Sequence, residues 1–241
     1  MDSDGLLFAQ ALVPFQAAEF GAAVTKFDQL TARYPIEHII EGADALYALP
    51  YFAYASAKTG DPLKLQQFIN GLKEAKFFEM SLANAYFDAL TNHHIASAAA
   101  NLDQAFAWMD RDLGRTPSVD YQYVDTAERL YRDTGDKRFR ERALHWARTL
   151  QHLQPWIAWP YLVDTELTDD PVERRSALVK ALFLDPLSPR LKAVSAADLN
   201  YARAQVKNGN PFLRAHKDIH IETTELPHCR QSAPCPGRAS S

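Results

Sequence analysis

Residues 23–35 of the chain read AVTKFDQLTARYP, and the spacing of four of them decides the fold. The small Ala23 is followed by Phe27 four positions later, by Leu30 three positions after that, and by Pro35 a further five positions on. Intervals of three and four residues place side chains on one face of an α-helix. A small residue lets a neighbouring helix approach closely, the larger residues fill the space beside it, and proline ends the helix. The stretch therefore predicts the second helix of a tightly packed helical hairpin.

The same helical spacing of apolar residues continues from Leu6 to Val206, and no credible strand interrupts it. Short turn clusters divide this span, among them TGDP at 59–62 and DPLSP at 185–189. The segments between turns are about 14 to 20 residues long, which suits helices in antiparallel hairpins. We expect hairpins at about 4–35, 43–76, 79–113, 120–154 and 157–186, and a closing helix at about 190–206.

Two observations indicate a repeat. The tripeptide Thr-Gly-Asp occurs at 59–61 and again at 134–136, a separation of about twice the length of a two-helix repeat. Residues 23–35 also resemble the second helix of a tetratricopeptide repeat (TPR) in their small, aromatic, aliphatic and proline positions. Pro14, Phe77 and Arg174 depart from the pattern of that family. The resemblance implies an all-α fold, an α-solenoid of about five hairpins in a TPR-like superhelix, whose first helices line a concave surface. An irregular all-α bundle is the alternative.

The chain divides into a helical repeat domain at 1–207 and an irregular tail at 208–241, because helical periodicity stops there and Pro and Ser become frequent. The tail contains residue types that bind zinc. Five residues separate its two cysteines, however, where a zinc site has two to four. A solvated tail, or an extended segment at 220–224 laid against the helices, is the ordinary interpretation. The possible zinc ligands are His216, His220, His228, Cys229 and Cys235.

Composition limits the kinds of partner. Lys and Arg number 26 against 30 Asp and Glu, a net charge of −4 that offers no basic excess for nucleic acid. The longest apolar run, 45–57, contains Pro50 and is too short to insert across a bilayer. The N-terminus is acidic, unlike a secretory signal, and the two cysteines near the C-terminus cannot form a disulfide framework for the domain. A cytoplasmic location is expected.

No motif for catalysis is present. The sequence lacks a glycine-rich phosphate loop, a nucleophile elbow and a His-Glu-x-x-His pair. His93 and His94 are adjacent, so on a helix they point about 100° apart and suit an exposed helix end better than a metal site. The acidic corner at 164–170 lacks the central glycine of a calcium loop, and Asp170 before Pro171 suits a helix N-cap. We predict no catalytic, metal or cofactor site.

Aromatic residues are the best candidates for partner binding. Three tyrosines at i, i+4 and i+7 share one face of the helix expected after residue 43, and later hairpins hold aromatics at comparable positions. Core packing is the competing interpretation of such a stripe. Gln122, Asp125 and Arg132 would add polar contacts to the same groove. The predicted groove residues are Tyr47, Tyr51, Tyr54, Tyr86, Tyr121, Arg129 and Trp159.

The expected function is non-enzymatic binding of a protein or peptide in this concave groove, as an adaptor or assembly factor. One alternative is a soluble accessory or regulatory module of an enzyme system, such as envelope glycan-handling machinery. Another is an enzyme whose Asp, Glu and His side chains converge in one pocket. Some TPR proteins grip the C-terminal carboxylate of a peptide with Lys, Asn and Arg. Aromatic or acidic residues hold most of the corresponding positions here, so that mode is not expected.

Overall fold

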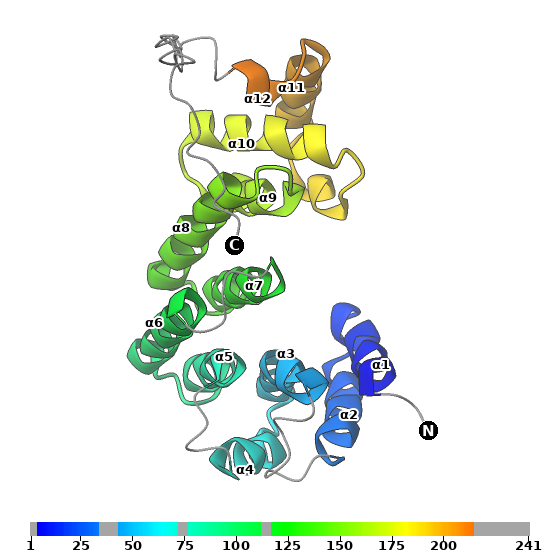
Figure 1. Ribbon diagram of the computed structural model, residues 1–241, viewed down its shortest axis with the longest axis vertical. Coiled ribbons are helices and arrows are strands. Elements are labelled where there is room, and N and C mark those ends of the chain that lie inside the picture. Colours follow the sequence, from blue (N-terminus) through cyan, green and yellow to red (C-terminus); the bar gives the residue numbers. More distant parts are fainter. Residues whose placement is uncertain (1–3, 34–42, 72–76, 112–116, 215–241) are drawn as a thin grey trace, which may run out of the picture.

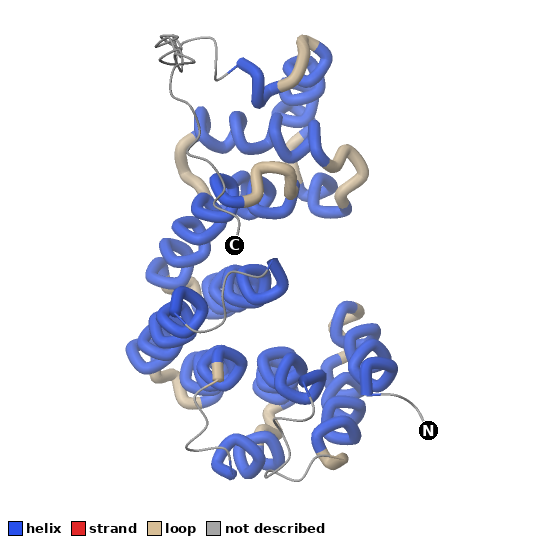
Figure 2. Tube along the Cα trace, viewed as in Figure 1, coloured by secondary structure: helices blue, strands red, loops and turns tan. Residues whose placement is uncertain are grey.

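The computed structural model describes residues 4–33, 43–71, 77–111 and 117–214, and every regular element in those ranges is helical. The all-α class predicted from the sequence is therefore confirmed. Figure 2 shows the helices joined mostly by short turns. The elements are α1 (Asp4–Gln16), α2 (Phe20–Thr31), α3 (Ala43–Thr59), α4 (Leu63–Gly71), α5 (Phe78–Tyr86), the π-helical turn η2 (Phe87–Thr91), α6 (Ile95–Arg111), α7 (Pro117–Thr134), α8 (Lys137–Leu153), α9 (Ala158–Leu167), α10 (Pro171–Leu184), the 3-10 helix η3 (Pro189–Ala193), α11 (Ala196–Lys207) and α12 (Pro211–Arg214).

Most helices pack against the next helix in the chain. The most extensive contacts join α1 with α2, α5 with α6, α7 with α8, and α9 with α10, and α3 packs equally well on α5. Each pair then contacts the next, since α2 packs on α3, α8 on α9 and α10 on α11. The helices consequently follow an arc from α1 at one end to α11 and α12 at the other (Figure 1).

The small residues that the sequence placed between helices are fully buried. Ala23, Ala143 and Ala181 have no exposed surface, and neither do Phe27 and Leu30 in the stretch that predicted the first hairpin. Because an alanine at a helix contact brings the two backbones close together, these positions leave no room for a larger side chain.

The repeated Thr-Gly-Asp tripeptide adopts the same backbone conformation at both of its positions. Gly60 after α3 and Gly135 after α7 have φ of +73° and +71°, in the left-handed region that glycine enters without strain. The amide of Gly135 donates to the carbonyl oxygen of Tyr131 at 2.7 Å, which satisfies one of the carbonyls left free at the end of α7. The positive φ at both helix ends favours glycine over residues that carry a side chain.

Two parts of the predicted hairpin pattern are wrong. The second hairpin, 43–76, is not a tight pair, because α3 packs mainly on α2 and α5 while α4 lies to one side (Figure 1). The closing helix at 190–206 is also interrupted. Pro189 begins the short 3-10 helix η3, and the Ser195 hydroxyl then accepts the amide of Asp198 at 3.1 Å to start α11. A serine cap at this position starts a new helix instead of continuing the first.

The buried side chains form two clusters. The larger extends from Leu7 to Leu167 and includes residues of α1 to α9, and the smaller lies between α9, α10 and α11. Of the predicted tail, residues 208–214 are described. There the ring of Phe212 packs on Tyr161 and Phe183, with centroid separations of 5.9 and 6.1 Å. The remainder of the tail lies outside the described residues, and so do its possible zinc ligands His216, His220, His228, Cys229 and Cys235.

Candidate functional site

One face of α7 carries most of the polar side chains of the candidate site. Tyr121, Asp125, Glu128, Arg129 and Arg132 follow one another at intervals of one, three or four residues, so they form a stripe along the helix. Proline suits the first position of this helix because its missing N–H would have no partner there. The stripe combines an aromatic ring, two carboxylates and two guanidinium groups.

The stripe lines a pocket that we call the α7 pocket. Its volume is about 380 Å³, within the range of small-molecule and side-chain binding sites. The lining residues come from α7, α9 and η3, and they are Tyr121, Asp125, Glu128, Arg129, Arg132, Glu166, Arg190 and Ala193. Three acidic and three basic side chains make the pocket electrically balanced.

Four of these charges form a network that joins the three helices. Arg190 Nε and Nη2 donate to the two carboxylate oxygens of Glu166, both at 2.8 Å, and Nη2 also contacts Glu128. Arg132 Nη2 donates to Glu128 at 2.5 Å and contacts Glu166 as well. Each carboxylate therefore meets two guanidinium groups, and η3 is held against α7 and α9.

Burial shapes the protonation of this network. Burial raises the pKa of the Glu128 carboxyl above its ordinary value, although the charges of Arg190 and Arg132 pull it down. Burial by itself would lower the pKa of Arg190, because it disfavours the charged guanidinium. Its hydrogen bonds to Glu166 and the negative charge of Glu128 outweigh that effect and raise the pKa of Arg190.

Behind the pocket, the guanidinium group of Arg129 stacks on two aromatic rings. The guanidinium of Arg129 lies 5.1 Å from the ring centroid of Phe15 and 5.2 Å from that of Tyr54. Its Nε donates to Asp125 at 2.8 Å, so Arg129 is fixed by both a carboxylate and two aromatic faces. Burial raises the pKa of Tyr51, with a further contribution from Asp125, which keeps the phenol protonated and able to donate a hydrogen bond.

Tyr121, which lines the pocket, packs on a second aromatic ring. The rings of Tyr121 on α7 and Trp159 on α9 have centroids 4.4 Å apart. Tyr121 is 41% exposed, and Trp159 is half-buried. Exposed aromatic rings that are already held against each other lose little conformational freedom when a partner covers them. This pair is the part of the site best suited to contact another molecule.

The predicted groove residues fall into two groups. Tyr121 and Arg129 line the α7 pocket, Trp159 packs on Tyr121, Tyr51 is half-buried and Tyr47 is 37% exposed on α3. Tyr54 and Tyr86 were predicted to face the groove, but the structure buries both, at 7% and 2% exposed. Their rings pack edge to face on each other at 5.1 Å, because α3 and α5 meet along that side.

Sequence reasoning missed Glu128, Glu166 and Arg190 as members of this site. Glu128 lies on the α7 stripe, between Asp125 and Arg132, and this spacing would have been enough to find it. Arg190 is 62 residues from Glu128 and belongs to a segment predicted as a regular helix. No local pattern indicates that this segment turns back onto α7.

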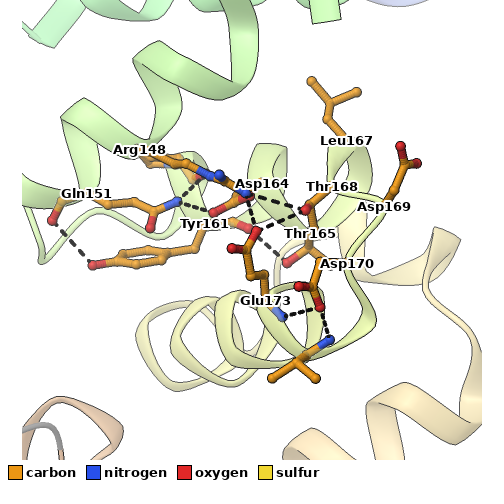
Figure 3. A network of polar contacts seen from close by, with 12 residues as sticks. Arg148, Gln151, Tyr161, Asp164, Thr165, Leu167, Thr168, Asp169, Asp170 and Glu173 are labelled. Carbon is orange, nitrogen blue, oxygen red and sulfur yellow. Dashed lines mark hydrogen bonds and ion pairs between the residues drawn. The ribbon is translucent and has the colours of Figure 1, made fainter. Parts of the chain in front are cut away.

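A second polar cluster joins α8, α9 and α10 (Figure 3). Arg148 Nη2 donates to Asp164 at 3.1 Å, to Thr168 at 3.3 Å and to Glu173 at 2.6 Å. Gln151 donates to the other oxygen of Asp164 at 3.1 Å. Because each carboxylate in the cluster already has partners, we interpret it as a structural link between the helices.

The other polar candidates from the sequence are a helix cap and two exposed histidines. Asp170 accepts the amides of Val172 and Glu173 at 2.7 and 3.3 Å, which confirms its predicted role as the N-cap of α10. His93 and His94 are exposed, in the turn between η2 and α6. Within the described ranges, no group of three or more His, Cys, Asp or Glu side chains is arranged to hold a metal ion.

None of the described helices is both long and apolar enough to cross a membrane. Comparison of the chain with models of protein families, with curated proteins and with solved structures found no match. Inferences about function therefore depend on the chain's own residues.

Proposed function

We propose that the chain is a TPR-like helical repeat module that binds a protein or peptide on the inner side of its arc. Its role would be that of a non-enzymatic adaptor or assembly factor. The pairwise packing of successive helices, with alanines at the closest contacts, is typical of such a repeat.

The observation that carries this proposal is the exposed Tyr121, which lines the α7 pocket and packs on the half-buried Trp159. Aromatic side chains are the usual anchors of protein interfaces, and arginines at the rim add directed hydrogen bonds. The carboxylates and guanidinium groups of the pocket are paired with one another, so a strongly charged partner would have to break existing ion pairs. Apolar and aromatic contacts should therefore supply most of the affinity.

The test begins with affinity capture on the full chain, mass spectrometry of the bound proteins and calorimetry with the partner so identified. Trp159→Ala and Tyr121→Ala should each weaken binding by about 2 kcal/mol. Arg138→Ala, an exposed change on α8, is the matched control. Binding should change little with salt, because screening acts on charges and not on apolar contacts. Unchanged affinity in the two aromatic variants would place the interface elsewhere.

A further inference from the structure

The end of the molecule formed by α10, η3, α11 and α12 (Figure 1) carries a charge opposite to that of the whole chain. Residues 171–214 contain eight Lys and Arg but only three Asp and Glu, whereas the chain has a net charge of −4. All three acidic groups are engaged. Glu173 and Asp198 pair with arginines, and Asp185 accepts the amide of Leu187 at 3.2 Å. Arg190 is itself balanced by Glu128 and Glu166, and the other basic side chains still leave this end with a positive charge.

A groove between α10 and α11 combines that charge with exposed apolar surface. It has a volume of about 230 Å³, and Val172, Val179 and Tyr201 lie along it with Pro211 of α12. Val172 is 75% exposed and Tyr201 is 43% exposed, so both offer apolar surface to a partner. A second groove of about 400 Å³, between α8 and α10, shares Val172, Ser176 and Lys180 with the first. Because both grooves border α10, we call the two together the α10 groove.

Two cations lie along the first part of the groove, and only one of them is free to pair. Arg175 is bonded to Asp198 at 3.0 Å and stacks on Tyr201 at 5.2 Å. The ammonium of Lys180 lies 5.5 Å from the ring centroid of Tyr161, and Lys180 makes no ion pair with any described residue. An anionic group that enters the groove would meet Lys180 without displacing a carboxylate.

We propose that the α10 groove binds an acidic amphipathic helix of a partner protein. An amphipathic helix carries apolar side chains along one face, which would contact the exposed Val172 and Tyr201. Its acidic side chains would pair with Lys180 and be attracted by the positive charge of the whole end, which speeds the encounter. The site is separate from the α7 pocket, so the two proposals stand or fall independently.

The probe is a fluorescein-labelled peptide of about 18 residues, with leucines at the helical spacing and glutamates on both flanks of the leucine stripe. Its binding to the full chain is followed by fluorescence anisotropy. Lys180→Glu should weaken binding by about tenfold or more, because it puts a like charge in the groove. Val172→Glu should do the same by placing a charge on the apolar wall. Arg203→Glu is the matched control, because it changes the net charge equally on an exposed position of α11 that does not line the groove.

Selective loss in the two groove variants, with at most a small change in Arg203→Glu and in Trp159→Ala, supports the proposal. Equal losses in Lys180→Glu and Arg203→Glu would show general electrostatic attraction and overturn it. Two further results would also overturn it: equal binding of a peptide with lysines in place of the glutamates, and no binding of the acidic peptide by the unmodified chain. Tighter binding to phosphatidylserine vesicles than to the peptide would assign the surface to a membrane instead.

Discussion

Replacing Arg190 by alanine should destabilise the fold by breaking the ion network of the α7 pocket. The Arg190 side chain is 25% exposed, while its partners Glu128 and Glu166 are 5% and 18% exposed. Breaking a fully buried pair costs about 3–5 kcal/mol, and breaking an exposed pair costs about 0–1 kcal/mol. Intermediate burial places the expected loss at about 2–3 kcal/mol. For a chain of this length that corresponds to a fall in Tm of roughly 4–12 °C.

Thermal unfolding followed by far-ultraviolet circular dichroism measures the effect. Lys192→Ala is the matched control, because Lys192 is an exposed cation of the same 3-10 helix and makes no ion pair with any described residue. Equal Tm values for Arg190→Ala and Lys192→Ala would refute the view that the network holds η3 in place. A double-mutant cycle of Arg190→Ala with Glu128→Gln should give a coupling of about 1 kcal/mol or more.

The pH dependence of this variant follows from Glu128. Its folded pKa is already raised by burial, so the folded state binds a proton more readily than the unfolded chain does. Loss of Arg190 removes a charge that favours the carboxylate, and this raises the folded pKa further. In the variant, the ionised Glu128 therefore lowers the free energy of unfolding most at neutral pH. The stability difference between Arg190→Ala and the unmodified protein should shrink as the pH falls toward the ordinary glutamate value.

Three further changes test the packing and the buried charges. Ala181→Trp should cost about 1–3 kcal/mol or more through overpacking, whereas Ala204→Trp on the exposed side of α11 should leave the Tm nearly unchanged. Glu79→Gln should raise the Tm at neutral pH, because burial raises the pKa of Glu79 and its ionised form destabilises the fold. That gain should vanish in acid, where Glu79 is protonated in both states. Asp136→Ala should cost about 1 kcal/mol in urea unfolding by removing the N-cap of α8. Hydrogen bonds from Arg138 lower the pKa of Asp136 in the folded protein to about 2. The stabilisation by the Asp136 carboxylate is therefore complete above the pKa of the unfolded chain, and it is lost as the pH falls toward the folded pKa.

The helices could be predicted because their signals are local. The spacing of Ala23, Phe27 and Leu30 depends on helix geometry alone, and all three residues are buried where that geometry puts them. The same holds for Gly135 and Asp170, which end and begin helices through bonds to residues a few positions away. Such features depend little on how distant parts of the chain are arranged.

The burial of the tyrosine stripe could not be predicted from spacing. Tyr51 and Tyr54 are three residues apart on one face of α3, yet Tyr51 is half-buried and Tyr54 is only 7% exposed. Phe15 of α1 packs on both rings, at 5.3 Å from Tyr51 and 5.8 Å from Tyr54. Tyr54 is also covered by Phe20 of α2 and Tyr86 of α5, whose rings lie 5.6 and 5.1 Å from it. A periodic pattern identifies the face of a helix but not which turns of that face are covered by another element.

The ion network gives the α7 pocket a property that the aromatic pair alone would lack. Arg132 and Arg190 both contact Glu128 and Glu166, so the wall formed by η3 is held by the same side chains that line the pocket. A ligand that contacts Tyr121 and leaves these ion pairs intact would bind to a preformed surface and lose little free energy in ordering it. A ligand that competes for either guanidinium would instead loosen η3 and lose affinity through that cost. Binding of the first kind should be insensitive to Lys192→Ala but weakened by Arg190→Ala, even though Arg190 need not touch the ligand.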